Sequence, residues 1–196
     1  MQAVLATGNP GKVVELKECF PQINWFAQTE LGVLDIEETG LSFIENAILK
    51  ARNAAKHTNL PALADDSGLI IDALDGRPGI YSARYANSNN FDDNINKVLT
   101  ELAGVALEKR TARFCCTLAV VKNHYDPCPI IATGFWEGII LEQKVGSNGF
   151  GYDPIFLEPS LGLSAAEISK KLKNEISHRA KAVAQIKQLL SEQYFC

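Results

Sequence analysis

Two long apolar runs decide the fold class of this chain: TARFCCTLAVVK at residues 111–122 and IIATGFWEGIILE at residues 130–142. Both have the length and the β-branched content that are typical of long strands. The short segment 123–129 joins them as a turn. We therefore expect an antiparallel hairpin, which forms part of a second lobe and leaves a cleft between the lobes.

The N-terminal part of the chain predicts a strand, a loop and a helix in that order. Residues 2–6 are short and apolar, residues 7–12 are rich in turn-forming types, and residues 13–20 have helical spacing. The same criteria predict further strands at residues 23–27, 62–64, 69–71 and 155–157, and helices at residues 42–57, 92–102 and from 164 onward with an interruption near 173–177.

This order of elements predicts the α/β class, with mixed α+β character: a mixed β-sheet flanked by helices. The chain has 196 residues, of which 46% are apolar, so it is large enough to bury a full core. We find no internal repeat and no linker. We therefore expect a single domain over residues 1–196, built as two lobes.

Charge and hydropathy exclude several kinds of partner. Lysine and arginine number 19 against 23 aspartates and glutamates, a formal charge of -4, so strong nonspecific binding of nucleic acid is not expected. The longest apolar stretches fall far short of the roughly 20 residues that span a bilayer. The N-terminus has neither a basic region nor a long apolar region, so we expect no secretory signal and a cytoplasmic protein.

The cysteines predict neither disulfides nor a zinc site. They are odd in number, and no Cys-x-x-Cys pair or nearby histidine stands at zinc spacing. Two of them are adjacent in a predicted strand, where their side chains point to opposite faces. The five are Cys19, Cys115, Cys116, Cys128 and Cys196.

The loop Thr7-Gly8-Asn9-Pro10-Gly11-Lys12 is a candidate anion site. It lies where a strand leads into a helix, so backbone amides, the helix dipole and the Lys12 ammonium can converge on a phosphate. It is not a Walker A loop, because Ala6 and Val13 stand where that motif needs Gly and Ser or Thr. The alternative is an ordinary Asn-Pro-Gly turn with a solvated lysine.

The run Asp65-Asp66-Ser67-Gly68 follows a short apolar strand, and ligands meet open α/β sheets at strand ends. Two adjacent carboxylates repel each other unless they share a cation or a proton, which favours a hard divalent metal. The alternative is an Asx turn. Glu37 and Glu38 are candidates for a further ligand, or else belong to a plain acidic loop. Glu45 needs no such role, since it completes a capping box with Ser42.

The loop 147–154 combines Phe150 and Tyr152 with a carboxylate, a composition suited to stacking on a planar ring and accepting hydrogen bonds at its edge. The alternative is a turn that packs Phe150 into the core. Further on, Lys173, His178 and Arg179 bring three hydrogen-bond donors near the start of a helix. Their alternative is a solvated helix end.

Seven motifs in fixed order strongly resemble the inosine/xanthosine triphosphate pyrophosphatase family. The similarity runs from about residue 3 to residue 190. The motifs are Thr7-Gly8-Asn9-Pro10-Gly11-Lys12, Glu37-Glu38-Thr39-Gly40, Phe43-x-Glu45-Asn46-Ala47, Ala64-Asp65-Asp66-Ser67-Gly68-Leu69, Pro78-Gly79-Ile80-Tyr81-Ser82-Ala83-Arg84-Tyr85, Phe150-Gly151-Tyr152-Asp153-Pro154 and Ser177-His178-Arg179.

The resemblance implies an enzyme that hydrolyses non-standard purine nucleotides such as ITP, dITP and XTP to the monophosphate and pyrophosphate. It implies an elongated sheet with two lobes and a central cleft, a homodimer and a Mg²⁺ cofactor. Asp66 would be the general base and a metal ligand, and Glu37 or Glu38, with Glu38 favoured, would supply another carboxylate. The triphosphate would bind Thr7, Gly8, Asn9, Pro10, Gly11, Lys12 and Ser67, and the purine would bind Phe150, Gly151, Tyr152, Asp153, Lys173, His178 and Arg179.

Two other functions stay open at this point. One is a pyrophosphatase for modified pyrimidine or methylated nucleotides on a related scaffold. The other is a nucleotide-binding sensor without turnover. A panel of nucleotides assayed for pyrophosphate release separates all three.

Overall fold

The structure is a computed structural model that describes residues 2–88 and 90–194, with the backbone alone for 191–194; Cys196 lies outside the described residues. The helices are α1 (Pro10–Cys19), α2 (Phe43–Thr58), α3 (Phe91–Glu101), α4 (Lys170–Ile176) and α5 (His178–Tyr194). The strands are β1 (Gln2–Ala6), β2 (Asn24–Ala27), β3 (Ala62–Ile71), β4 (Thr111–Val121), β5 (Ile130–Ile140), β6 (Phe156–Glu158) and β7 (Leu163–Ser164).

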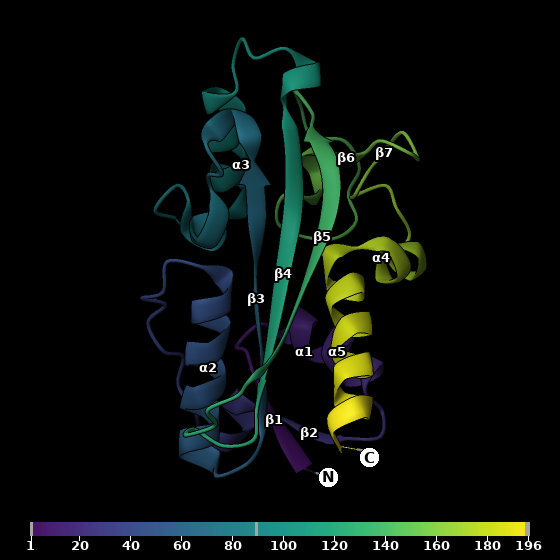
Figure 1. The fold of residues 1–196 in the computed structure, drawn as a ribbon. Helices are drawn as coiled ribbons and strands as arrows, with labels where there is room; N and C mark the ends of the chain where they lie inside the picture. Colours follow the sequence, from purple (N-terminus) through teal and green to yellow (C-terminus); the bar gives the residue numbers. More distant parts are fainter. Residues whose placement is uncertain (1, 89, 195–196) are drawn as a thin grey trace. The chain divides into compact units, whose positions relative to one another are not determined.

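Within the described residues, the strands form one seven-stranded sheet in the order β2-β1-β3-β4-β5-β6-β7 (Figure 1). β1 is parallel to both β2 and β3, with Leu5 opposite Ala27 and Leu63. β6 is antiparallel to β5 and β7. The sheet is therefore mixed and carries helices beside it, which confirms the predicted fold class. The two longest strands, β4 and β5, are neighbours joined by residues 122–129, as the opening sequence runs predict.

The described residues divide into two compact units. The first takes in residues 2–66, 117–133 and 182–194, and the second takes in residues 67–116 and 134–181. The strands β3, β4 and β5 each contribute residues to both units. Each unit has a hydrophobic core of its own.

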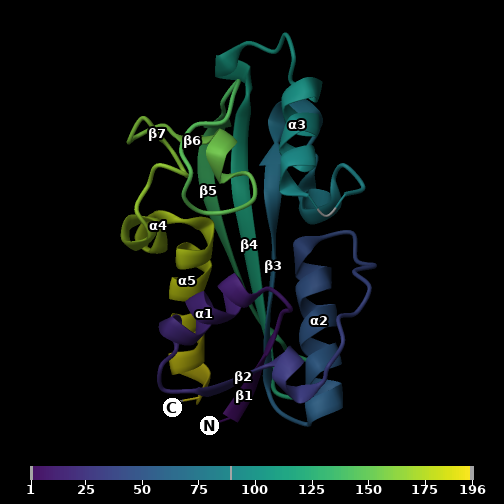
Figure 2. The same cartoon turned by 180° about the vertical axis from the view of Figure 1, so that it is seen from behind.

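The first unit packs α2 against the sheet through small side chains. In Figures 1 and 2, α2 lies on one side of the strands β1 and β3, and α5 lies on the other. Four alanines spaced along one face of α2 are fully buried, and their small size lets the helix approach the strands closely. This cluster includes Ala47, Ala51, Ala54 and Ala55 of α2, and Val4, Ala6, Ala62 and Ala64 of β1 and β3.

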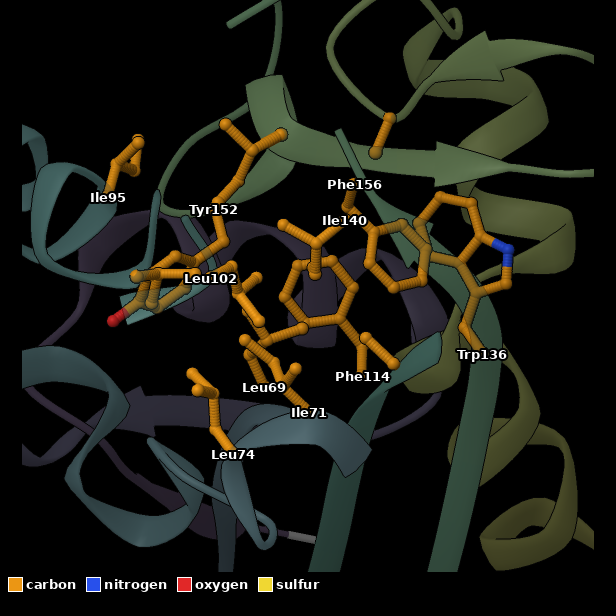
Figure 3. Packing of buried hydrophobic residues seen from close by; sticks show 14 of the residues in the cluster. Leu69, Ile71, Leu74, Ile95, Leu102, Phe114, Trp136, Ile140, Tyr152 and Phe156 are labelled. Carbon is orange, nitrogen blue, oxygen red and sulfur yellow. The ribbon is translucent and has the colours of Figure 1, made fainter. Parts of the chain in front are cut away.

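The second unit has a core of larger side chains. The Phe114 ring lies 4.5 Å from the Phe156 ring between centroids, and the Trp136 ring lies 5.2 Å from that of Phe156 (Figure 3). Aromatic rings at these separations add a favourable pair interaction to the area they bury. The core extends to Ile95 and Leu102, on or next to α3.

Strand β3 corrects one prediction. The sequence predicts a break after Ala64, with Asp65-Asp66-Ser67-Gly68 as a loop or an Asx turn, but the structure continues a single strand from Ala62 to Ile71. Asp65 and Asp66 are 1% and 6% exposed in the middle of that strand. Charged groups can be buried only when they are paired, so the continuity of β3 depends on partners elsewhere in the chain.

The helix predicted from residue 164 onward also begins later. Residues 163–164 form β7, and α4 starts at Lys170, where the Ser169 side chain accepts a hydrogen bond from the amide of Leu172. The predicted interruption is present, because α4 ends at Ile176 and α5 begins at His178. None of the helices in the described ranges has the length and the apolar character needed to cross a bilayer.

Candidate functional site

Asp65 and Asp66 each pair with a different lysine. Consecutive strand residues point to opposite faces of a sheet, so the two carboxylates require partners from different elements. Lys12 of α1 forms an ion pair with Asp65, and Lys50 Nζ of α2 lies 2.6 Å from Asp66 Oδ1. Each buried carboxylate therefore has its own ammonium, which allows β3 to run uninterrupted.

Lys50 also binds Glu38. Its Nζ lies 2.8 Å from Glu38 Oε1, so one ammonium joins a loop carboxylate to the strand carboxylate of Asp66. Sequence reasoning missed Lys50, although a signal was present. Lys50 comes three residues after the buried Ala47 and four before the buried Ala54, and the helical period puts it on the buried face of α2. A lysine at such a position needs a buried partner.

The carboxylates of Glu38 and Asp66 fit a divalent cation. Asp66 Oδ2 is buried and has no hydrogen-bond partner in the described part of the chain, although a carboxylate oxygen is a strong acceptor. Glu37, by contrast, is exposed. Residues 2–88 and 90–194 contain no group of three or more acidic, histidine or cysteine side chains placed to hold a metal. Two carboxylates are enough for a hard divalent cation that completes its shell with water and phosphate.

Burial and charge act against each other at this site. Burial raises the pKa of Asp66 above the usual range for an aspartate, and the nearby Lys50 ammonium only partly offsets that rise. Burial alone would lower the pKa of Lys50, but the attraction of Asp66 and Glu38 outweighs it and raises that pKa. Lys50 is therefore a stable cation, and Asp66 is a stronger base than an exposed aspartate.

The loop from Thr7 to Lys12 caps α1. Asn9 Oδ1 accepts hydrogen bonds from the amides of Gly11 and Lys12 at 2.9 and 3.2 Å, and Pro10 opens the helix, so α1 begins inside the predicted loop. Because the cap uses these two amides, the Lys12 ammonium is the main feature of the loop that favours an anion. Gly8 lies close to the Asp35 carboxylate, and an added Cβ at 2.9 Å would require that side chain to move.

Three of the residues expected to bind the purine form a cluster in the second unit. Asp153 is 3% exposed, pairs with the Lys173 ammonium and accepts a hydrogen bond of 2.8 Å from the amide of Phe150. Lys173 Nζ also lies 5.4 Å from the centroid of the Phe150 ring. That ring is 46% exposed, which contradicts the alternative that it packs into the core.

The two aromatics of this loop differ in their environment. Tyr152 is buried in the core of the unit, where its hydroxyl donates to the carbonyl oxygen of Ser82 at 2.9 Å. Burial also raises the pKa of this hydroxyl well above its usual range. Of the two rings, only Phe150 has the exposed face that stacking on a base requires. The structure thus places the Tyr152 side chain in a structural position, and Gly151 between the two is half-buried.

His178 and Arg179 lie at the start of α5 and are 7% and 8% exposed, so they do not form a solvated helix end. The His178 imidazole stacks on Phe114, with ring centroids 4.9 Å apart and 18° between the planes. Trp136 lies nearly parallel to the same imidazole at 6.4 Å. The aromatic core therefore fixes the plane in which His178 presents its nitrogens. Ser67, the first residue of this unit in β3, is half-buried.

Comparison with known proteins gives consistent matches over nearly the whole chain. Residues 3–189 match the Ham1 family. A protein named dITP/XTP pyrophosphatase from Legionella pneumophila (strain Paris) is 52% identical over 192 residues, which are 97% of this chain and 99% of that one. A protein of the same name from Yersinia pseudotuberculosis serotype I (strain IP32953) is 55% identical over 183 residues, 92% of this chain and 93% of that one.

Solved structures agree with the fold. A HAM1 protein from Coxiella burnetii superposes with a TM-score of 0.93 at 49% identity, covering 98% of this chain and 99% of that one. A Mycobacterium abscessus structure titled nucleoside-triphosphatase / dITP/XTP pyrophosphatase gives a TM-score of 0.79 at 37% identity, covering 95% and 98%.

Proposed function

This chain belongs to the Ham1 family, and from that premise we propose that it hydrolyses non-standard purine nucleoside triphosphates, namely ITP, dITP and XTP, to the monophosphate and pyrophosphate. It is a nucleoside triphosphate pyrophosphatase, a hydrolase that acts on a phosphoanhydride bond. One structural observation carries the proposal. Asp66 is a buried carboxylate with a raised pKa, its Oδ2 accepts no hydrogen bond from any described residue, and Lys50 binds both Asp66 and Glu38.

Asp66 acts as the general base in this proposal. A water molecule attacks the α-phosphorus, its proton passes to Asp66 Oδ2, a new oxygen–phosphorus bond forms, and the bond from the α-phosphorus to the bridging oxygen breaks. Pyrophosphate leaves with that oxygen. A base of raised pKa takes up the proton more readily than an ordinary aspartate, provided that the working pH keeps it ionised.

The lysines neutralise charge on the phosphates. Lys12 and Lys50 are held by Asp65 and Asp66, so both ammonium groups are fixed before substrate arrives. Fixed charges stabilise a transition state without reorganisation, which is the largest electrostatic contribution that a phosphoryl-transfer site makes. Glu38 and Asp66 would hold Mg²⁺, which when bound offsets the negative charge of the triphosphate.

The purine end of the substrate is proposed to contact the residues that the sequence predicted for it. Phe150 offers an exposed ring for stacking, and Lys173, His178 and Arg179 offer hydrogen-bond donors to the 6-oxo group that hypoxanthine and xanthine carry. Adenine has an amino donor at that position, so ATP would oppose donor with donor. Mispaired polar groups of this kind reject an analogue by about 10⁴ or more when they are buried.

A panel of nucleotides with Mg²⁺, assayed for pyrophosphate, tests the proposed function. We expect ITP, dITP and XTP to yield the monophosphate and pyrophosphate in equal amounts. We expect Asp66→Asn to lose at least about a hundredfold in turnover with its fold intact. Turnover of only modified pyrimidine or methylated nucleotides, or binding without turnover, would refute the assignment. A near wild-type rate in Asp66→Asn would remove Asp66 from the mechanism.

We also propose that the enzyme works in the cytoplasm as a homodimer. The substrates are soluble nucleotides, and the composition gives no reason to expect a nucleic-acid or membrane partner. Light scattering at micromolar concentration measures the mass. A value near that of a single chain, 21.4 kDa, would exclude the dimer.

A further inference from the structure

Several contacts join α2 to the loop that carries Glu38, and one of them uses a fully buried side-chain amide. We infer that Asn46 is a positioning residue: by binding the backbone of Gly40 it holds Glu38 against Lys50 and next to Asp66. The inference rests on the proposed function to the extent that Glu38 serves the phosphates and their metal.

The anchoring contact is short, and its acceptor residue is fully buried. The amide of Gly40 donates a hydrogen bond of 2.8 Å to Asn46 Oδ1, and Asn46 is 0% exposed. This bond also fixes the orientation of the side-chain amide, because the opposite orientation would place two donors against each other. The backbone of the loop is thus held two residues after Glu38.

The helix geometry links the anchor to the site. Asn46 and Lys50 are four residues apart on α2, so they lie one above the other on the same face of the helix. Asn46 holds the loop backbone, and Lys50, one turn further, binds the carboxylate of Glu38 at 2.8 Å. A loop fixed at the first position brings the Glu38 side chain within reach of the second.

A second contact at the same end of α2 reinforces the anchor. Glu45 Oε2 accepts a hydrogen bond of 2.9 Å from the amide of Leu41 and another from the Ser42 hydroxyl, while the amide of Glu45 donates to Ser42 Oγ. Two consecutive backbone amides of the loop, those of Gly40 and Leu41, are therefore held by the first turn of the helix. The loop cannot shift at Gly40 without losing these bonds.

Packing at Gly40 leaves no room for a side chain. An added Cβ would lie 2.6 Å from Asn46 Oδ1 and 2.6 Å from the Cβ of Glu45. The φ angle of Gly40 is outside the left-handed region, so an alanine is excluded by contact and not by backbone conformation. The close approach of loop and helix is thus what requires glycine here, which gives an independent way to displace the loop.

The side-chain nitrogen of Asn46 makes no hydrogen bond to any described residue, whereas its oxygen does. This nitrogen, Nδ2, is buried. A buried polar group with an unmade bond is unfavourable, and leucine would fill a similar volume without that loss. Leucine would, however, leave the Gly40 amide without its acceptor, so the contact with the loop, and not packing around the helix, favours asparagine at this position.

The test compares four variants. Asn46→Leu removes the acceptor at similar volume, Asn46→Asp keeps it, and Gly40→Ala displaces the loop from the opposite side. Ala55→Gly is the matched control, since it weakens the same helix at its far end without touching the loop. Three readouts are taken on each full-length protein: amide exchange at Gly40 by NMR, affinity for Mn²⁺ alone by electron paramagnetic resonance, and the Mg²⁺ concentration that gives half-maximal turnover of ITP.

We expect Asn46→Leu and Gly40→Ala to speed exchange at Gly40, and to weaken Mn²⁺ binding and raise the Mg²⁺ requirement by about 10-fold or more, the range found when a residue that orients a metal ligand is lost. Asn46→Asp should stay within a few-fold of wild type, and Ala55→Gly should change neither metal readout. Faster exchange in Asn46→Leu with both metal readouts at the level of Ala55→Gly would overturn the inference.

Failure of the proposed function gives a different result. If the wild type hydrolysed none of ITP, dITP and XTP, the proposed function would fall, while Gly40 exchange and Mn²⁺ affinity would still measure whether Asn46 positions Glu38. If Asn46→Leu proved unstable, Gly40→Ala and Asn46→Asp would decide the question. Equal Mn²⁺ affinity in these two variants would count against it.

Discussion

Replacing Lys50 with methionine perturbs the site most directly, because it removes one charge and leaves the two carboxylates in place. Lys50 Nζ lies 2.6 Å from Asp66 and 2.8 Å from Glu38, and the three side chains are 16%, 9% and 23% exposed. Removing one partner of a buried ion pair costs about 3–5 kcal/mol. The remaining carboxylate avoids part of that cost by taking up a proton. The pKa of Asp66 should therefore rise further in this variant, because the ammonium group that lowers it is gone.

The direction of the pH effect follows from the role proposed for Asp66. Burial already raises its pKa, and the Lys50 ammonium is the largest opposing influence. Only the ionised carboxylate accepts a proton, so activity falls as the pH drops through this pKa. We expect the acidic limb of the kcat/KM profile to move to higher pH in Lys50→Met.

Stability should change in the matching sense. A carboxyl group whose pKa is higher in the folded than in the unfolded state lowers stability once the pH exceeds the unfolded value, and the loss is complete above the folded value. Relative to wild type, Lys50→Met should therefore lose stability as the pH rises from acidic to neutral. Denaturant unfolding at several pH values measures this difference.

A matched control separates this effect from the loss of any lysine. Lys17 also pairs with a glutamate, Glu30, but at 3.4 Å and with both side chains more than a third exposed. Pairs of this kind contribute little, so Lys17→Met should leave the kcat/KM profile unchanged. If Lys50→Met kept the wild-type acidic limb, the reasoning that its ammonium governs the proton affinity of Asp66 would be refuted.

The purine cluster gives two further predictions. Gly149 has a φ of +76°, and an added Cβ would lie 2.0 Å from Asp153 Oδ2. Gly149→Ala should therefore cost about 1–3 kcal/mol of stability and raise the KM for ITP, which denaturant unfolding and kinetics on one preparation measure. An unchanged KM would show that Asp153 has no part in substrate binding. His178→Ala should lower the ratio of kcat/KM for ITP to that for ATP by about tenfold or more, and equal losses on both nucleotides would assign His178 to general binding or structure.

Most of the fold could be predicted from local patterns. The runs at 111–122 and 130–142 have strand length and composition, and the Ser42-x-x-Glu45 pattern marks where α2 begins, although Glu45 accepts from the amide of Leu41 and not from that of Ser42. Both signals act over a few residues, so one sequence is enough to read them. The number of strands in the sheet and their order depend on pairing between distant segments, which no local pattern records.

The break predicted inside β3 shows where local reasoning fails. Two adjacent aspartates and a glycine are typical of a turn when they are considered alone. They lie within a strand here because Lys12 and Lys50, distant in sequence, neutralise them. Local patterns also gave no role to Lys50, and they did not distinguish Phe150, which is exposed, from Tyr152, whose hydroxyl bonds within the core.

The pairing of charges in β3 also has a consequence for binding. Asp65 and Asp66 must point to opposite faces, so their two lysines come from α1 and α2 and cannot exchange. A phosphate that approaches Lys12 competes with Asp65, while one that approaches Lys50 competes with Asp66 and Glu38. A carboxylate that loses its lysine in this way stays buried and charged, which is costly unless a cation or a proton replaces the ammonium. Binding of the triphosphate at Lys50 and uptake of a cation by Glu38 and Asp66 should therefore favour each other, and the same strand that buries the two aspartates would couple substrate to metal.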